Sequence, residues 1–217
     1  MDFIRILIIV AVVAVVGLII AALISAFYHS QRNRARKAGK LTPRRELEAF
    51  LLDTNYRRNV FSHLYFPVIE EGTAKPRHYQ RIDEVVVTKG GVLILTVFDK
   101  NGRIDNSGKD TWIQIKDDER FEIESPLITA EKNKDLIRVV LKRAGYGKVP
   151  IYSTVVFMHD DAIPLSGYDD MIYMSELEKL LRDMNKMSVL GGIEQFYVCR
   201  ALKSSGLSRQ TIIKNKL

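Results

Sequence analysis

The chain begins with one long, uncharged and largely apolar run, from Ile6 to Ala26. About 20 apolar residues are enough for a helix to cross the roughly 30 Å hydrocarbon core of a bilayer. We therefore expect residues 1–28 to form a transmembrane signal anchor. A cleaved signal peptide is the alternative, but its apolar stretch is usually about 7 to 15 residues long.

The pattern of apolar positions after Pro43 is helical. Leu47, Phe50, Leu51 and Tyr56 recur at the spacing of one helix face, and proline suits the first turn of a helix. This stretch predicts the first helix of a folded domain that follows the membrane segment.

Short runs rich in Val, Ile and aromatic residues come next, separated by turn signals such as Lys-Gly-Gly and Lys-Asn-Gly. Such runs are typical of β-strands. They predict consecutive antiparallel strands at residues 60–69, 81–88, 92–98 and 111–115, with an alternating, edge-like strand at 120–124.

The period then changes to that of a helix. Residues 130–144 carry Leu136, Val140 and Leu141 along one face, and glycines follow. The apolar run at 150–158 fits a strand covered on both faces, so helix and strand together predict an α/β crossover.

The last third of the chain predicts a short strand and two helices. The strand is at 171–174, one helix starts at Ser175 with Glu178 three residues on as in a capping box, and the other covers 192–203. The expected fold class is α/β, with a mixed α+β sheet.

Charge is distributed unevenly along the chain. The net charge is +7; Asp2 and Arg5 cancel within residues 1–31, residues 32–45 contribute +7, and residues 46–217 therefore sum to zero. The seven basic residues are Arg32, Arg34, Arg36, Lys37, Lys40, Arg44 and Arg45. Lys and Arg beside a transmembrane end favour the cytoplasmic side, so we expect a single-pass protein of the cell membrane with its N-terminus outside and its C-terminal domain in the cytoplasm.

The basic residues make the segment 29–43 a juxtamembrane linker. Clustered Lys and Arg next to a membrane bind anionic lipid headgroups, and the same charges bind the phosphates of nucleic acid. The sequence does not decide between anionic lipid and nucleic acid as the partner of this linker.

Few side chains outside this linker are candidates for a catalytic or metal-binding role. Cys199 is the sole cysteine, which excludes an internal disulfide, and its apolar surroundings favour a buried thiol over a nucleophile. His63 and His78 have no plausible partners nearby in the sequence. We interpret residues 159–161, His-Asp-Asp, as a solvated loop rather than a metal site.

Four stretches carry a resemblance to a known family: residues 80–87 (QRIDEVVV), residues 91–98 (GVLILTVF), Gly102-Arg-Ile and Trp112. They resemble the nuclease-related domain (NERD) family, a branch of the PD-(D/E)XK nucleases with a restriction-endonuclease-like fold. The resemblance covers residues 44–160. Residues 161–217 are expected to form a helical extension that packs on this domain.

The family resemblance implies a catalytic motif, which is degenerate in this chain. In the family an Asp on one strand and a Glu-x-Lys on the next hold a divalent cation and steady the attacking water. Asp83 matches the Asp, and Glu46 is the candidate for an upstream Glu. The Glu and Lys positions are occupied by Thr96 and Phe98.

We therefore expect a catalytically inactive domain that needs no cofactor and acts as a nucleic-acid-binding or scaffolding module at the membrane. One alternative is a Mg²⁺-dependent nuclease in which Asp83 holds the metal and Lys100 substitutes for the missing lysine. In a third interpretation the C-terminal helices bind a protein partner. The residues Asp99 to Gly102 fit a simple hairpin turn.

Overall fold

The computed structural model describes residues 42–53, 59–68, 76–164, 170–208 and 211–212. The expected membrane anchor at 1–28 and almost all of the linker at 29–43 lie outside these residues. The part of the chain that the structure describes contains no helix long and apolar enough to cross a membrane. By its internal contacts the chain divides into two compact units, Met1–Ala49 and Phe50–Leu217.

Helix α2 (Pro43–Asp53) runs across the division between the two units. Pro43 is its first residue, as predicted, and Leu47 and Leu51 of the predicted apolar face are fully buried. Tyr56, the last residue of that expected face, lies outside the described residues.

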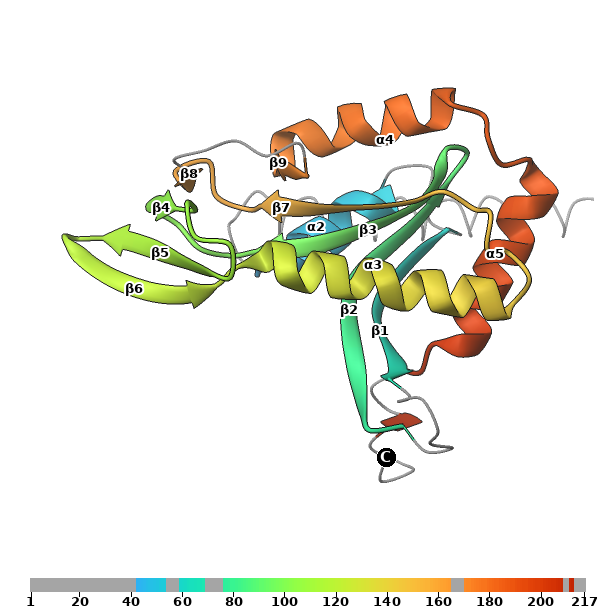
Figure 1. Ribbon diagram of the computed structural model, residues 1–217. Coiled ribbons are helices and arrows are strands. Elements are labelled where there is room, and N and C mark those ends of the chain that lie inside the picture. Colours follow the sequence, from blue (N-terminus) through green and yellow to red (C-terminus); the bar gives the residue numbers. More distant parts are fainter. Residues whose placement is uncertain (1–41, 54–58, 69–75, 165–169, 209–210, 213–217) are drawn as a thin grey trace, which may run out of the picture. The chain divides into compact units, whose positions relative to one another are not determined.

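The second unit is built on a five-stranded mixed sheet (Figure 1). In spatial order its strands are β1 (Val60–Val68), β2 (His78–Thr88), β3 (Gly91–Phe98), β7 (Ile151–Phe157) and β9 (Met171–Tyr173). The strands β1, β2 and β3 are antiparallel neighbours, whereas β7 runs parallel to β3 and β9 parallel to β7. The three antiparallel strands and the buried strand near 150–158 are thus as predicted.

The parallel pair is reached through helix α3 (Pro126–Arg143), which crosses one face of the sheet (Figure 1). Ile137 and Leu141 of α3 are fully buried in one core cluster with valine and isoleucine side chains of β2 and β3. The helix starts four residues earlier than predicted because Pro126 occupies its first turn. It stops as predicted, with Gly145 at a φ of +88°.

The strand expected at 111–115 belongs to a second sheet, which corrects the prediction of one continuous antiparallel series. Its order is β6 (Glu119–Glu124), β5 (Thr111–Lys116), β4 (Arg103–Asp105) and β8 (Ile163–Pro164). The edge position of β6 is as predicted. The residues Asp99 to Gly102 do not close a hairpin, because β3 and β4 belong to different sheets and this segment connects them.

The C-terminal part adds a 3-10 turn, η1 (Met174–Glu176), and the helices α4 (Leu177–Lys186) and α5 (Gly192–Ser205). The capping box expected at Ser175 and Glu178 is wrong. The 3-10 turn delays the helix start, the backbone N–H of Tyr173 donates to the Glu176 carboxylate at 2.9 Å, and Glu178 pairs with Arg182 instead. Residues 161–217 therefore supply strands to both sheets as well as helices.

Candidate functional site

Asp83 lies on β2 beside a local distortion of β1. The pairing of β1 with β2 runs from Val60 and Val86 to Ser62 and Glu84, omits His63, and resumes beyond it. His63 has a φ of +54°, a left-handed conformation that is rare for non-glycine residues within a strand. The sheet is therefore irregular where the candidate carboxylate stands.

Arg81 connects the two residues at this distortion. Its Nη2 lies 3.2 Å from Asp83 Oδ1 and 2.9 Å from His63 Nδ1. Because a guanidinium only donates hydrogen bonds, His63 Nδ1 is the acceptor and carries no proton there. The sequence interpretation of His63 as an isolated histidine is corrected by this contact.

The guanidinium changes what Asp83 can bind. The Asp83 side chain is 14% exposed and has a permanent positive charge beside it. A divalent cation at the same carboxylate would meet that charge, so the pair with Arg81 disfavours metal binding at Asp83.

Glu84, the next residue on β2, lies in the interior with 1% exposure. Its Oε2 accepts a hydrogen bond of 2.7 Å from the Ser62 hydroxyl on β1. This contact gives the Glu84 carboxylate a structural role in joining the two strands.

Thr96, the residue that the resemblance places at the Glu position, lies on β3. It pairs in register with Val155 of β7 and is 5% exposed. Among the described residues its Oγ1 has no hydrogen-bond partner. A neutral hydroxyl enclosed in this way lacks the negative charge with which a carboxylate would hold Mg²⁺.

Phe98, the residue that the resemblance places at the Lys position, belongs to an aromatic cluster. Its ring centroid is 4.8 Å from that of Phe157 and 5.7 Å from that of Trp112, and Tyr173 lies against Phe157 at 5.8 Å. These rings join β3, β7, β9 and the second sheet in one core. The Phe98 side chain is thus part of the hydrophobic packing.

Asp99 and Lys100 follow β3 and are both exposed. Since β3 ends at Phe98, strand alternation does not determine the direction of the Lys100 side chain, and a substitute role for Lys100 stays a prediction. Asp99 Oδ1 instead lies 2.8 Å from His159 Nε2, in the segment that follows β7.

The remaining predicted site residues lie elsewhere. Glu46 stands in the first turn of α2 within the unit Met1–Ala49, whereas Asp83 belongs to the other unit. Arg44 and Arg45 are exposed on the same turn. The other basic residues, from Arg32 to Lys40, lie outside the described residues.

The donor set does not fit a divalent metal. Within the described stretches no three His, Cys, Asp or Glu side chains are close enough to hold an ion. The cation beside Asp83 and the aromatic ring at position 98 both oppose one. We therefore derive no metal-dependent step from this site.

Two contacts near the site had no signal in the sequence. Gln80 of β2 donates to Asn133 Oδ1 of α3 at 3.1 Å, and Arg81 reaches His63 across the strand pair. Asn133 is 2% exposed, so this amide pair is a buried polar link between helix and sheet. Helical spacing around Asn133 predicts its burial but not its partner.

The mixed sheet, the crossover helix and the carboxylate on the second strand are consistent with an α/β domain of the nuclease-like class. The sequence model of the nuclease-related domain (NERD) matches residues 41–158, which is more than half of the chain. The chain belongs to the NERD family. No curated protein and no solved structure matches it significantly.

Proposed function

We propose that this NERD protein is a single-pass membrane protein whose cytoplasmic domain binds nucleic acid without cutting it. The family assignment supports a nuclease-related role. The substitutions at Thr96 and Phe98, together with the pair Arg81–Asp83, support loss of cleavage.

The observation that carries this proposal is the environment of Phe98. A catalytic lysine must reach the phosphate with a mobile ammonium group, but the side chain at this position is 5% exposed and lies against two other rings. The benzyl side chain of Phe98 has no hydrogen-bond donor and no charge. It stabilises the core and cannot stabilise the negative charge that develops on a phosphodiester during cleavage.

Binding of nucleic acid is supported by the basic residues of the chain. Arg81 is partly exposed beside Asp83, and seven Lys and Arg residues lie between positions 32 and 45. Contacts between such cations and phosphate supply most of the affinity for nucleic acid of any sequence. The same seven charges, next to the apolar run at 6–26, support the membrane anchor and the cytoplasmic orientation.

The test of inactivity is a cleavage assay on the full chain in lipid nanodiscs. Single- and double-stranded DNA and RNA are incubated with Mg²⁺ or Mn²⁺, with Asp83→Ala as the matched control. We expect no cleavage above that of the control. Metal-dependent cleavage that Asp83→Ala abolishes would overturn the proposal.

The test of binding is fluorescence anisotropy with nanodiscs of neutral lipid. If all seven basic residues contact phosphates, log K against log salt has a slope of up to about −5 for single strands. Replacing Arg32, Arg34 and Arg36 by Gln is expected to reduce the slope by about 2. Binding that is absent, or that ignores salt, contradicts the nucleic-acid role.

A second candidate function is supported by the contact between Asp99 and His159. Carboxylate-paired histidines act as general bases, and this pair follows two parallel strands with Lys100 next to it. This second candidate function predicts a cleavage of nucleic acid that needs no divalent ion and is retained in the variant Asp83→Ala. His159→Ala would abolish such cleavage, and persistence of the activity in that variant removes this candidate.

A further inference from the structure

Five large apolar side chains are exposed together near the start of α5. They are Met187, Val189, Ile193, Phe196 and Tyr197, with exposed fractions between 45% and 76%. We call these five residues the α5 surface. Large apolar side chains exposed in one place mark a surface with a binding role.

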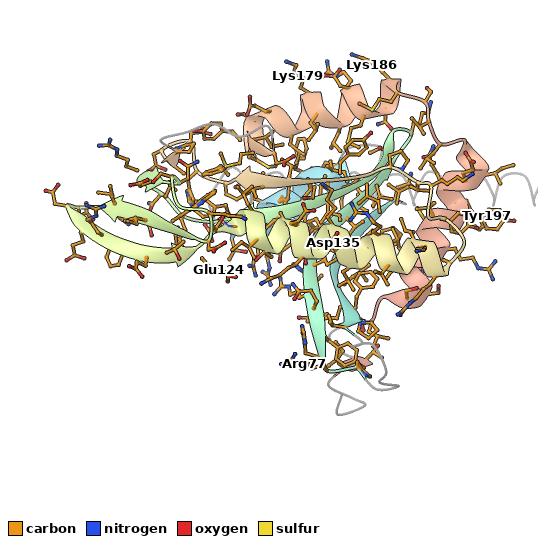
Figure 2. The ribbon with its side chains drawn as sticks, viewed as in Figure 1. Arg77, Glu124, Asp135, Lys179, Lys186 and Tyr197 are labelled. Atoms are coloured by element: carbon orange, nitrogen blue, oxygen red, sulfur yellow. The ribbon has the colours of Figure 1, made fainter. Side chains whose placement is uncertain are left out.

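Three residues of the α5 surface lie on one face of α5, whose other apolar face is buried. Ile193, Phe196 and Tyr197 follow the i, i+3, i+4 spacing, and the last two rings contact each other at 5.5 Å between centroids. Val198 and Leu202 are fully buried in the core cluster against the sheet. The helix is therefore held by one face while the other presents side chains outward, as Tyr197 does in Figure 2.

The loop before α5 is fixed to the turn between β2 and β3. Leu190 N donates to Lys89 O at 2.7 Å, and Lys89 N donates to Asn185 Oδ1 at 3.0 Å. These bonds on both sides of the loop hold Met187 and Val189 beside the turn. The apolar side chains of loop and helix thus form a preorganised surface.

Basic side chains surround the α5 surface. Lys89, Lys186, Arg200 and Lys203 are exposed on the adjoining turn and helices, and Lys186 extends from the end of α4 in Figure 2. Two acids lie in the same region: Glu194 accepts from Gly191 N at 2.8 Å, and Asp183 forms an ion pair with Lys186 at 2.8 Å. Four cations against these two carboxylates leave the rim with a net positive charge around an apolar centre.

We propose that the α5 surface docks on an anionic lipid bilayer. Phe, Ile, Met and Val side chains insert at the boundary between headgroups and acyl chains, Tyr suits the interface itself, and the basic rim contacts anionic headgroups. The inference rests on the proposed anchor, because a 15-residue linker at 29–43 keeps the domain close to the bilayer in which residues 6–26 are embedded.

A second copy of the chain fits this surface less well. Stable protein interfaces bury about 800 Å² on each partner with about 20 to 30 residues a side, whereas the apolar centre here consists of five side chains. A ring of four basic residues on both copies would also repel. A lipid surface requires no complementary shape.

The test places a fluorophore at a single cysteine of the full chain. Cys199→Ser removes the native thiol, and Tyr197→Cys or Phe121→Cys introduces the labelling site; both side chains are 45% exposed, and Phe121 lies on the edge strand β6. Proteoliposomes contain phosphatidylserine or phosphatidylcholine alone, with spin-labelled acyl chains as quenchers. Circular dichroism confirms that each labelled chain is folded.

We expect a blue shift and quenching at position 197 but not at position 121, and stronger quenching with phosphatidylserine. Phe196→Ser should reduce the docked-to-undocked ratio at position 197 roughly tenfold, as expected for loss of one inserted aromatic side chain. No quenching at 197, or equal quenching at 197 and 121, overturns the proposal. Concentration-dependent crosslinking of Tyr197→Cys chains without quenching overturns it in favour of a dimer.

Failure of the anchor is recognised separately by extraction at alkaline pH. A chain that resists extraction but shows no quenching at 197 retains the anchor and loses the docking surface. A chain that is extracted but still quenched at 197 in the presence of phosphatidylserine vesicles retains the docking surface and loses the anchor. A chain that is extracted and unquenched loses both.

Discussion

Phe98 of β3 and Phe157 of β7 are register neighbours on parallel strands, and their ring centroids lie 4.8 Å apart at an interplanar angle of 51°. Phe98 is the residue that the sequence resemblance places at the Lys position. Its side chain packs in the core between Phe157 and Trp112.

Replacing Phe98 by Ala is expected to lower the free energy of unfolding by about 3 to 5 kcal/mol, because it empties a ring-sized volume between Phe157 and Trp112. Urea unfolding followed by the fluorescence of Trp112, the sole tryptophan, measures the change. The control Phe121→Ala removes a half-exposed ring and should change the free energy by less than about 1 kcal/mol. Equal effects of the two variants would contradict the aromatic core.

Gly91→Ala is expected to destabilise the turn between β2 and β3. Gly91 has a φ of +141°, and a Cβ there would lie 2.4 Å from the carbonyl oxygen of Pro150, which is bonded to Val92 N. We expect a loss of more than about 2 kcal/mol by thermal or urea unfolding. In the control Gly192→Ala, the new Cβ meets nothing within 4 Å, so that variant should be neutral or slightly stabilising.

Cys199 is expected to react slowly with thiol reagents in the folded protein. Burial raises the pKa of its thiol from 9.0 to about 11, and the Sγ lies 3.7 Å from Asn59 Oδ1. At neutral pH the folded chain then holds about a hundredfold less thiolate than the unfolded chain. Iodoacetamide labelling should accelerate about tenfold per pH unit up to about pH 11.

The sign of the linked effect on stability follows from the same shift. The folded state holds the Cys199 proton more tightly than the unfolded state, so this contribution to stability is complete below about pH 9 and is lost as the pH rises toward about 11. Cys199→Ser should flatten the fall of stability in that window. A labelling rate equal to that of the urea-unfolded chain would contradict the burial of the thiol.

The sequence was sufficient where a period extends over many residues. The apolar runs of β3 and β7 and the helical period of α3 cover seven or more residues each, and long segments of this kind define their own structure. The predicted face of α3, through Leu136, Val140 and Leu141, is only partly correct, because Ile137 and Leu141 are the fully buried pair. The mixed sheet follows from these elements, because a helix between two strands favours a parallel crossover.

The sequence was insufficient where structure depends on distant partners. The strands β4 and β8 have three and two residues, too short for any period, and they exist because β4 lies between β5 and β8. Without β4 the segment after Phe98 reads as a hairpin turn. The start of α4 was misplaced because Glu176, and not Glu178, caps the preceding turn.

The strand positions of the candidate site residues could be predicted from the sequence, but the contacts of their side chains could not. Asp83, Thr96 and Phe98 lie on strands that the apolar runs of the sequence predict, whereas the roles that the resemblance assigns to them stay predictions. Strand alternation places Arg81 and Asp83 on one face, but the second contact of Arg81, with His63, depends on a left-handed backbone conformation of His63 that the sequence does not predict. A local backbone irregularity such as that at His63 does not change the periodicity of apolar residues in the sequence.

The amide pair between Gln80 and Asn133 offers a last test of how the helix α3 is held over the site-bearing strand β2. Asn133→Ala removes one acceptor of the partly buried Gln80 Nε2, which keeps its bond to Arg81 O, so we expect a loss of about 1 kcal/mol in the free energy of unfolding. A double-mutant cycle with Gln80→Ala should give a coupling energy of about 1 kcal/mol, because each single variant already breaks the bond. The control Asp135→Ala, on the exposed side of α3, removes a surface ion pair with Arg138 and should change stability by less than about 1 kcal/mol. Additive effects of Gln80→Ala and Asn133→Ala would show that the two amides do not interact, and that apolar packing alone positions the helix on the strand that carries Asp83.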